Sequence, residues 1–300
     1  MGADYRCFFC FNRAFEKLMI QEQLEPAEAK YFTNEIMQLY LDKQEEFSTP
    51  QLARELHARL KKCTNNADPY EIRKKQSNDL ILAGYQKFKN QIQSSQNPFD
   101  TALRLAIAGN IIDFAIDDSY KLDATIDKVL HSDFAIDHSS QLKSDLDNAQ
   151  SVLYLGDNNG EIVFDKLLIE TINHSNLIYA VRDKPIINDV TLADANYVGL
   201  DQLVPVISNG YDAPSTILEY CSKDFLNVFN QADVIISKGQ GNLEGLMETQ
   251  NRNIFYLLMV KCDVIAEKLH VKKGDFVVTK TTALNQGTET PDSNEKYSKE

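Results

Sequence analysis

Oxygen-bearing side chains gather directly after a short apolar run near the middle of the chain. The run Ser-Val-Leu-Tyr-Leu at 151–155 leads into Gly-Asp-Asn-Asn-Gly-Glu at 156–161. Carboxylate and side-chain amide oxygens are the ligands that Mg²⁺ and Mn²⁺ prefer, so this segment could supply one part of a divalent metal site. The same composition is also typical of a tight turn, because Asn, Asp and Gly tolerate left-handed backbone conformations.

Polar residues also accompany the next three apolar runs. Asp189 and Asp212 each lie a few residues beyond a run, and Lys238 stands at the end of another. Taken alone, Asp189 would be equally consistent with a helix N-cap. If the runs are parallel strands, however, their carboxyl ends meet at one edge of a sheet, which is where ligands bind in such folds. The convergence of these groups therefore predicts a single site.

The segment Lys-Gly-Gln-Gly-Asn at 238–242 suits an anion. Lys238 could reach a phosphate as a point charge, and Gly239 and Gly241 would let backbone N–H groups approach the same anion. The glycine spacing also resembles a dinucleotide-binding fingerprint. A dinucleotide site is disfavoured, because the segment follows a late run and the two residues after the next run, Lys261 and Cys262, provide no acid for a ribose.

Two polar residues interrupt the most apolar helical segment of the first half, at 100–116. Asn110 and Asp113 are three positions apart, so they lie on one face of the expected helix. Buried polar groups need partners, because burying them unpaired is costly. Either they hydrogen-bond to a neighbouring helix, or the helix closes over the strand ends and adds both side chains to the site.

The elements that must position these residues follow two different patterns. Residues 1–147 show successive segments with helical spacing, two of which begin with Pro in the first turn, and they predict a helical bundle. From 148 to 284, short apolar runs alternate with helical segments and turns, which predicts a mainly parallel sheet with helices on its faces. The polar, aperiodic end at 285–300 is expected to be disordered.

The charge balance limits the classes of partner. The formal net charge of −13 argues against nucleic acid or an anionic membrane, because both require clustered Lys and Arg. A small anionic substrate remains compatible, since a metal and a few cations can reverse the local field. The chain has no apolar run of membrane-spanning length and no secretory signal at its start, so a cytoplasmic location is expected. The sequence does not indicate the oligomeric state.

Five cysteines are spread widely along the chain, and the odd number disfavours a secreted disulfide framework. Cys7 and Cys10 form a CxxC motif without the second pair that a structural zinc site would need. Reduced thiols packed beside a helix explain the motif as well as a metal or redox role does. Cys262 is the expected third member of a metal or redox group.

Five motifs in order resemble those of the metal-dependent damage-control phosphatases, a family long catalogued as domain of unknown function eighty-nine. They are GDNNGEIVFDKLLIE, VRDKPIINDVTLADA, SNGYDAPST, SKGQGNLEGL and VKCDVIAEKLHVKKGDFVV. The early CFFCFNRA and the segment NPFDTALRLAIAGNIIDF resemble a short, mostly prokaryotic subfamily that carries a CxxC motif. The resemblance extends from about residue 7 to residue 280.

This resemblance implies a three-layer α/β/α Rossmann-like domain with an added helical bundle. It also implies a divalent cation, with Mn²⁺, Mg²⁺, Co²⁺ or Ni²⁺ supporting the hydrolysis of phosphomonoesters. The metal ligands of the family fall on Asp157, Asn158 and Asp189, and its phosphate-contacting lysine falls on Lys238. Further matching positions, two of them of less certain role, are Gly239, Gly241, Glu161 and Asn242.

Together, the residues and the resemblance predict a metal-dependent phosphatase that acts on small, in part damaged, phosphorylated metabolites such as sugar phosphates. The catalytic set is Asp157, Asn158, Asp189 and Lys238. The nucleophile is either a metal-bound water, with Asp212 or Glu161 as base, or a site carboxylate. Substrate contacts are predicted for Lys238, Gly239, Gly241, Asn242, Asp212, Glu161, Arg182, Asn110 and Asp113.

Two other functions are compatible with this sequence. A non-catalytic protein that binds a nucleotide or phosphometabolite could use the Lys-Gly-Gln-Gly-Asn segment as an anion cradle, and binding without turnover would identify it. A methyltransferase shares only the sheet architecture with the expected fold, and binding of S-adenosylmethionine would identify that function.

Overall fold

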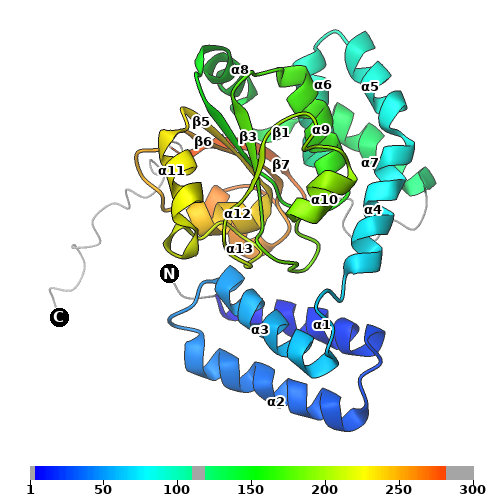
Figure 1. Cartoon of the computed structure of the whole chain (residues 1–300), viewed down its shortest axis with the longest axis vertical. Helices are drawn as coiled ribbons and strands as arrows, with labels where there is room; N and C mark the ends of the chain where they lie inside the picture. Colours follow the sequence, from blue (N-terminus) through cyan, green and yellow to red (C-terminus); the bar gives the residue numbers. More distant parts are fainter. Residues whose placement is uncertain (1–3, 110–118, 282–300) are drawn as a thin grey trace, which may run out of the picture.

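The computed structural model describes residues 4–109 and 119–281 (Figure 1). Within these two ranges the chain forms thirteen α-helices and one seven-stranded sheet. The predicted α/β fold class, with a mainly parallel sheet and an N-terminal helical part, is confirmed. Asn110 and Asp113 lie outside the described residues, so their place in the site stays a prediction. Among the helices of the described ranges, none combines the length and hydropathy that a membrane span needs.

The first three helices form a bundle with a hydrophobic core of its own. They are α1 (Tyr5–Gln21), α2 (Pro26–Lys43) and α3 (Thr49–Thr64). Proline stands in the first turn of α2 and of α3, where a backbone N–H has no partner within the helix and its absence costs nothing. The bundle core consists of apolar side chains from the inner faces: Phe15, Leu18, Phe32, Ile36, Leu39, Leu52, Leu56 and Leu60.

The next helices lead from the bundle to the sheet. α4 (Glu71–Ala83) and α5 (Tyr85–Ser94) divide one long amphipathic stretch at Gly84, and α6 (Pro98–Ala108) and α7 (Ser119–His131) follow. Side chains of α5 and α6 share one hydrophobic core with a face of the sheet. These helices therefore belong to the packing of the α/β part.

A strand and a helix precede the region where strands were expected. β1 (Phe134–Asp137) pairs in parallel with β7 at the edge of the sheet, and α8 (Ser139–Asn148) follows it. The range 1–147, expected to be all helical, therefore contains one strand. Residues of β1 alternate between half-buried and exposed over only four positions, which is too short to stand out in the sequence. The expected domain boundary at 147 stays a prediction.

The other six strands coincide with the apolar runs of the sequence. They are β2 (Val152–Leu155), β3 (Leu177–Val181), β4 (Val206–Ser208), β5 (Val234–Lys238), β6 (Ile254–Met259) and β7 (Phe276–Lys280). The strand order is β1-β7-β6-β5-β2-β3-β4, and all neighbours are parallel except β6 and β7. The chain leaves β2 toward β3 and returns on its other side as β5, which places a topological switch point between β2 and β5.

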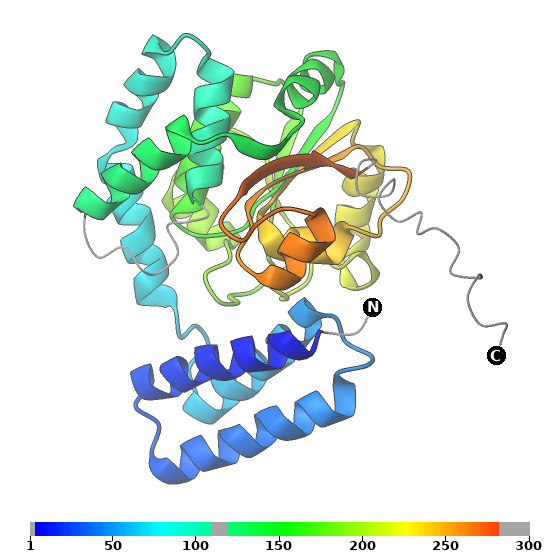
Figure 2. The same cartoon turned by 180° about the vertical axis from the view of Figure 1, so that it is seen from behind.

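Helices cover both faces of the sheet and complete the expected three layers (Figure 2). α9 (Glu161–Ile172) lies with α6 on one face, where α10 (Leu192–Tyr197) also packs. α11 (Lys223–Gln231), α12 (Gly239–Leu246) and α13 (Asp263–Leu269) cover the other face. Successive residues of the central strands, such as Val152 and Leu153 of β2, consequently belong to two different hydrophobic cores.

The α1–α3 bundle lies beside the edge of the sheet at which the parallel strands end, next to α12 and α13 (Figure 1). Arg54 of α3 forms an ion pair of 2.5 Å with Asp212, which follows β4. Arg6 of α1 donates two hydrogen bonds of 2.7 and 2.8 Å to the carboxylate of Glu267 in α13. The bundle thus contacts α13 and the loop after β4, which carries the predicted site residue Asp212.

Candidate functional site

The predicted ligands Asp157, Asn158 and Asp189 meet at the switch point of the sheet, and we call these three residues the strand-end cluster. Asn158 and Asp189 form an isolated antiparallel bridge, and the Val190 N–H donates to the carbonyl of Asp157 at 2.9 Å. The Asn158 amide nitrogen donates to Asp157 Oδ2 at 2.7 Å. All three side chains are largely buried. The loops after β2 and β3 are therefore joined through their backbones as well as their side chains.

Asn159 and Asn78 hold the loop after β2 in place. The Asn159 side chain donates to the carbonyls of Asn188 at 3.0 Å and Asp189 at 3.2 Å. Asn78 of α4 donates to Asn159 Oδ1 at 2.7 Å and accepts from the Gly160 N–H at 2.6 Å. Sequence reasoning missed Asn78. Its only sequence signal is a polar residue on the buried side of an amphipathic helix.

Gly239 brings the loop after β5 against the strand-end cluster. Its φ is +76°, in the left-handed region, and a Cβ there would come within 1.8 Å of Asp157 Oδ2. A Cβ at Gly241 would come within 2.3 Å of the Pro214 carbonyl oxygen. Both glycines thus permit close approach of three strand-end loops. Their predicted contact with an anion stays a prediction.

Arg182 and Asn242 lie behind the carboxylates. Arg182 is 2% exposed, and it donates to Asp189 Oδ2 at 2.7 Å, to Asn242 Oδ1 at 2.9 Å and to Thr216 Oγ1 at 3.2 Å. One of its nitrogens lies 3.8 Å from Asp157 Oδ1. Asn242 donates in turn to backbone carbonyls at the ends of β2 and β5. The observed role of both residues is to fix the carboxylates, and the predicted substrate contact stays a prediction.

Lys238 lies beneath the cluster and is completely buried. Its ammonium group donates to Asp165 Oδ1 at 2.7 Å, to the Ala106 carbonyl at 2.8 Å and to Glu161. Burial opposes the charge, but the two carboxylates outweigh burial and raise the pKa of Lys238. Burial likewise raises the pKa of Asp165 to about 6, against the effect of Lys238. The predicted phosphate contact of Lys238 stays a prediction, since its donors in this structure serve three protein acceptors.

The electrostatics of the cluster are dominated by crowded carboxylates. Burial raises the pKa of Asp157 well above its usual value, and the neighbouring charges of Asp189 and Glu161 raise it further. Lys261 and Arg182 act in the opposite direction. Lys261 follows β6 and is half-buried, and sequence reasoning did not assign it to the site. Its signal was available, because it comes two residues after the strand that neighbours β5.

Asp212 lies on the side of the site that faces the α1–α3 bundle. It is half-buried and pairs with Arg54, whose guanidinium group also lies over the Tyr211 ring at 4.9 Å. The role of Asp212 as a base stays a prediction.

The strand-end cluster has the donor chemistry of a hard divalent cation. It offers the carboxylates of Asp157 and Asp189, whose mutual repulsion a cation would relieve. The Asn158 amide nitrogen faces two carboxylates, Asp157 at 2.7 Å and Glu161 at 3.1 Å, so its oxygen points the opposite way. In the described ranges no three His, Cys, Asp or Glu side chains are arranged to hold a metal. A cation here would therefore depend on the Asn158 oxygen, with water or substrate completing its shell.

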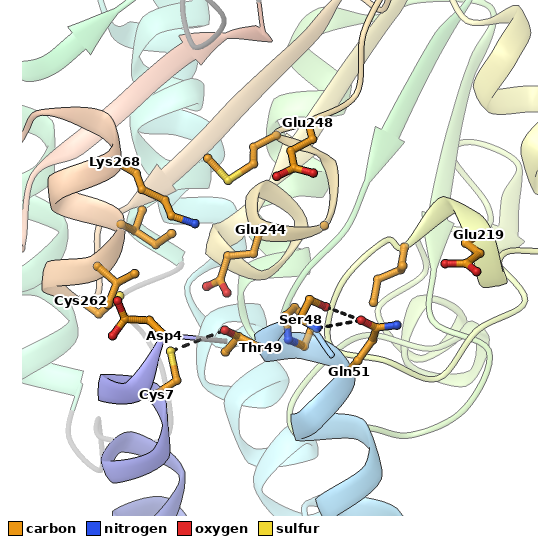
Figure 3. A pocket seen from close by; sticks show the side chains of 16 residues that line it. Asp4, Cys7, Ser48, Thr49, Gln51, Glu219, Glu244, Glu248, Cys262 and Lys268 are labelled. Carbon is orange, nitrogen blue, oxygen red and sulfur yellow. Dashed lines mark hydrogen bonds between the residues drawn. The ribbon is translucent and has the colours of Figure 1, made fainter. Parts of the chain in front are cut away.

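Two of the singled-out cysteines lie elsewhere, in a cavity of about 400 Å³ between the bundle and the α12 and α13 helices (Figure 3). Cys7 accepts a hydrogen bond from Thr49 at 3.5 Å, and Cys262 accepts one from Gln240 at 3.3 Å. Burial raises the pKa of Cys7. Cys10 is exposed and is not among the lining residues. The three thiols therefore do not share one site in this structure.

Comparison with known proteins agrees with this architecture. The family model described as the damage-control phosphatase ARMT1-like domain matches residues 3–277. An uncharacterized protein of Methanocaldococcus jannaschii is 37% identical over 239 residues, which cover 75% of this chain and 77% of the relative. A damage-control phosphatase of Pyrococcus horikoshii is 36% identical over 222 residues, which cover 73% of this chain and 76% of the relative.

A solved structure is also similar. The crystal structure of a DUF89 family protein from Pyrococcus horikoshii has a TM-score of 0.86 and 31% sequence identity to this chain. The match covers 94% of this chain and 99% of that one. The family match over nearly the whole chain, together with these relatives, leads to one conclusion. The chain belongs to the damage-control phosphatase ARMT1-like domain family.

Proposed function

We propose that this protein is a metal-dependent phosphatase that hydrolyses phosphomonoesters of small metabolites. The single observation that carries the proposal is the meeting of Asp157, Asn158 and Asp189 at the switch point, with the amide oxygen of Asn158 directed away from its carboxylate partners. Two similar proteins are named damage-control phosphatases, which supports the reaction class. The expected cations are Mn²⁺, Mg²⁺, Co²⁺ and Ni²⁺.

Asp157, Asn158 and Asp189 would hold the cation. A bound divalent cation supplies positive charge that stabilises the negative charge developing on a transferring phosphoryl group. Arg182 keeps Asp189 in place, because its Nε–H group donates a hydrogen bond of 2.7 Å to the Asp189 carboxylate. Lys261 is a half-buried cation whose charge acts on Asp157, and it would attract the phosphate of a bound substrate. Positioning and charge neutralisation are the main requirements for phosphoryl transfer.

The substrate is a small phosphorylated metabolite, and a damaged sugar or cofactor phosphate is the expected class. The backbone N–H groups beside Gly239 and Gly241 begin α12, where the partial positive charge of a helix N-terminus favours an anion.

Asp212 and Glu161 remain the proposed bases. Membership of the subfamily with an early CxxC motif is part of the same proposal.

Substitution of Asp157 tests the proposed function. The Asp157→Ala protein should lose phosphate release from p-nitrophenyl phosphate with Mn²⁺ by well over about 100-fold, since even partners outside the ligand shell cost about 10- to 100-fold. Asp201→Ala is a matched control, because Asp201 is an exposed aspartate of the same domain that pairs with Asn196. The control should keep wild-type activity. Full activity of Asp157→Ala, or activity that EDTA leaves unchanged, would contradict the proposal.

A further inference from the structure

A network of polar side chains is buried directly beneath the strand-end cluster. It consists of Glu161 and Asp165 of α9, Lys238 of β5, Tyr154 of β2 and Tyr179 of β3, and each of them is fully buried. We call these five residues the buried network. The proposed phosphatase reaction does not explain why three of them, Tyr154, Asp165 and Tyr179, should be polar.

The hydrogen bonds of the network form a chain that leads from the sheet interior to Asn158. Tyr154 and Tyr179 donate to the two carboxylate oxygens of Asp165 at 2.7 and 2.9 Å. Asp165 accepts from the Lys238 ammonium at 2.7 Å, and Lys238 also donates to Glu161. Glu161 accepts in turn from the Asn158 amide nitrogen at 3.1 Å. An unbroken chain of hydrogen bonds thus connects the sheet interior with a predicted metal ligand.

The last contact fixes the orientation of the Asn158 amide. Only the NH₂ side of an amide can face two carboxylates, because its oxygen has no proton to donate. Asp157 and Glu161 together therefore turn the Asn158 oxygen away from themselves. Asp157 is itself a predicted ligand. Glu161, anchored by Lys238, is the partner that keeps the amide in this orientation whether or not Asp157 is engaged.

The Tyr179 hydroxyl group occupies the space that a side chain at position 156, beside the strand-end cluster, would need. A Cβ at Gly156, the residue before Asp157, would come within 2.3 Å of the Tyr179 hydroxyl oxygen. A buried ion pair seldom adds stability over well-packed apolar side chains of similar volume. A network that is fully buried, fully paired and directed at one amide is better explained by positioning than by stability.

We propose that Asp165, with Tyr154, Tyr179 and Lys238, forms a positioning relay that anchors Glu161 and thereby orients Asn158 for metal binding. This inference rests on the proposed metal-dependent function. It gives Lys238 a role in positioning a ligand. Asp165 and both tyrosines are positioning residues, because they act through Glu161 and Asn158.

The test measures Mn²⁺ binding to the full-length protein by isothermal titration calorimetry. The Tyr154→Phe/Tyr179→Phe variant removes both donors to Asp165 and keeps every charge, and Asp165→Asn removes the charge at constant shape. Each should raise the Kd for Mn²⁺ by about tenfold or more, as losing partners of metal ligands does. Excess Mn²⁺ should restore phosphate release, because the ligands themselves are intact. A residue with only a structural role would not show this rescue.

Tyr256→Phe is the matched control. Its hydroxyl is buried and donates to the Leu246 carbonyl at 2.9 Å, and the residue packs in the core of the opposite face of the sheet. The control should lose a hydrogen bond and keep the wild-type Kd. If Asp165→Asn fails to fold, the double tyrosine variant decides the question.

The outcomes separate this inference from the proposed function. A folded double variant with a Kd within twofold of wild type, in a protein that binds Mn²⁺ and releases phosphate, overturns the relay alone. The same rise in Kd for Tyr256→Phe would also overturn it. A wild-type protein that neither binds Mn²⁺ nor releases phosphate overturns both.

Discussion

The core of the α1–α3 bundle and the buried network beneath the strand-end cluster both bury titratable side chains, but His57 of the bundle is neutral at pH 7 whereas Lys238 of the network is charged. In the bundle, His57 is fully buried, with its ring nitrogens bonded to the Ala53 carbonyl at 2.7 Å and the Tyr70 hydroxyl at 3.1 Å. Burial lowers the pKa of His57 to about 4, so the ring is neutral at pH 7. Lys238, which is completely buried, has a raised pKa because two carboxylates surround it.

The two regions differ in the free-energy cost of the groups that they bury. A neutral imidazole with two hydrogen-bonding partners needs no counter-ion, so the bundle tolerates it in an otherwise apolar core. Removing an ammonium group and two carboxylates from water is far more costly, and their attraction repays it only when the geometry is good. The buried network meets that cost directly below Asn158 and Asp157, where Lys238 lies between two fully buried carboxyl groups.

The largest effect on the free energy of unfolding is expected from Lys238→Met. This change leaves Glu161 and Asp165 buried without their cation, and it should lower the free energy of unfolding by about 3–5 kcal/mol. Lys74→Met is the matched control. Lys74 is also buried and lies 2.6 Å from Asp68 and 3.5 Å from Asp194, but these carboxylates are 14% and 15% exposed and can hydrate, so about 1 kcal/mol is expected. Urea denaturation measures both, and equal losses would break the comparison.

A smaller effect is expected from pH in the bundle. The unfolded chain protonates His57 near pH 6.5, whereas the folded protein does so only near pH 4. Between these values the unfolded state binds the extra proton, so the free energy of unfolding falls as the pH falls. The loss from this residue should reach about 3 kcal/mol below pH 4.

His57→Gln provides the control for this pH dependence, because Gln keeps a hydrogen-bonding side chain that does not titrate. The difference in unfolding free energy between wild type and variant should shrink as the pH is lowered from 7 to 4. It would be measured by urea denaturation at each pH. A constant difference would mean that the histidine is not kept neutral by burial.

Sequence patterns predicted the scaffold better than the connections within the site. Six strands were evident from their apolar runs, and the parallel arrangement followed from the alternation of strands and helices. Asp157 and Asp189 could be brought together by that logic alone, since strand ends share an edge. β1 was missed, because four half-buried residues at the edge of a sheet carry too weak a pattern.

The buried network could not be foreseen, for a physical reason. Asp165 lies on a helix and Lys238 ends a strand 73 positions later, and nothing local indicates that they meet. The phosphate contact predicted for Lys238 rests on its glycine neighbours and on the family resemblance. Depth below the surface decides between a phosphate contact and a buried ion pair, and depth depends on tertiary packing.

The position of a bound metal ion tests directly whether Asp157, Asn158 and Asp189 form a cation site. Crystals soaked in Mn²⁺ would be measured by anomalous diffraction at the manganese absorption edge. We expect an anomalous peak in contact with the side-chain oxygens of Asp157, Asn158 and Asp189. A peak only in the cavity lined by Cys7 and Cys262, or none at the strand-end cluster in crystals that hydrolyse a phosphomonoester with Mn²⁺, would contradict it.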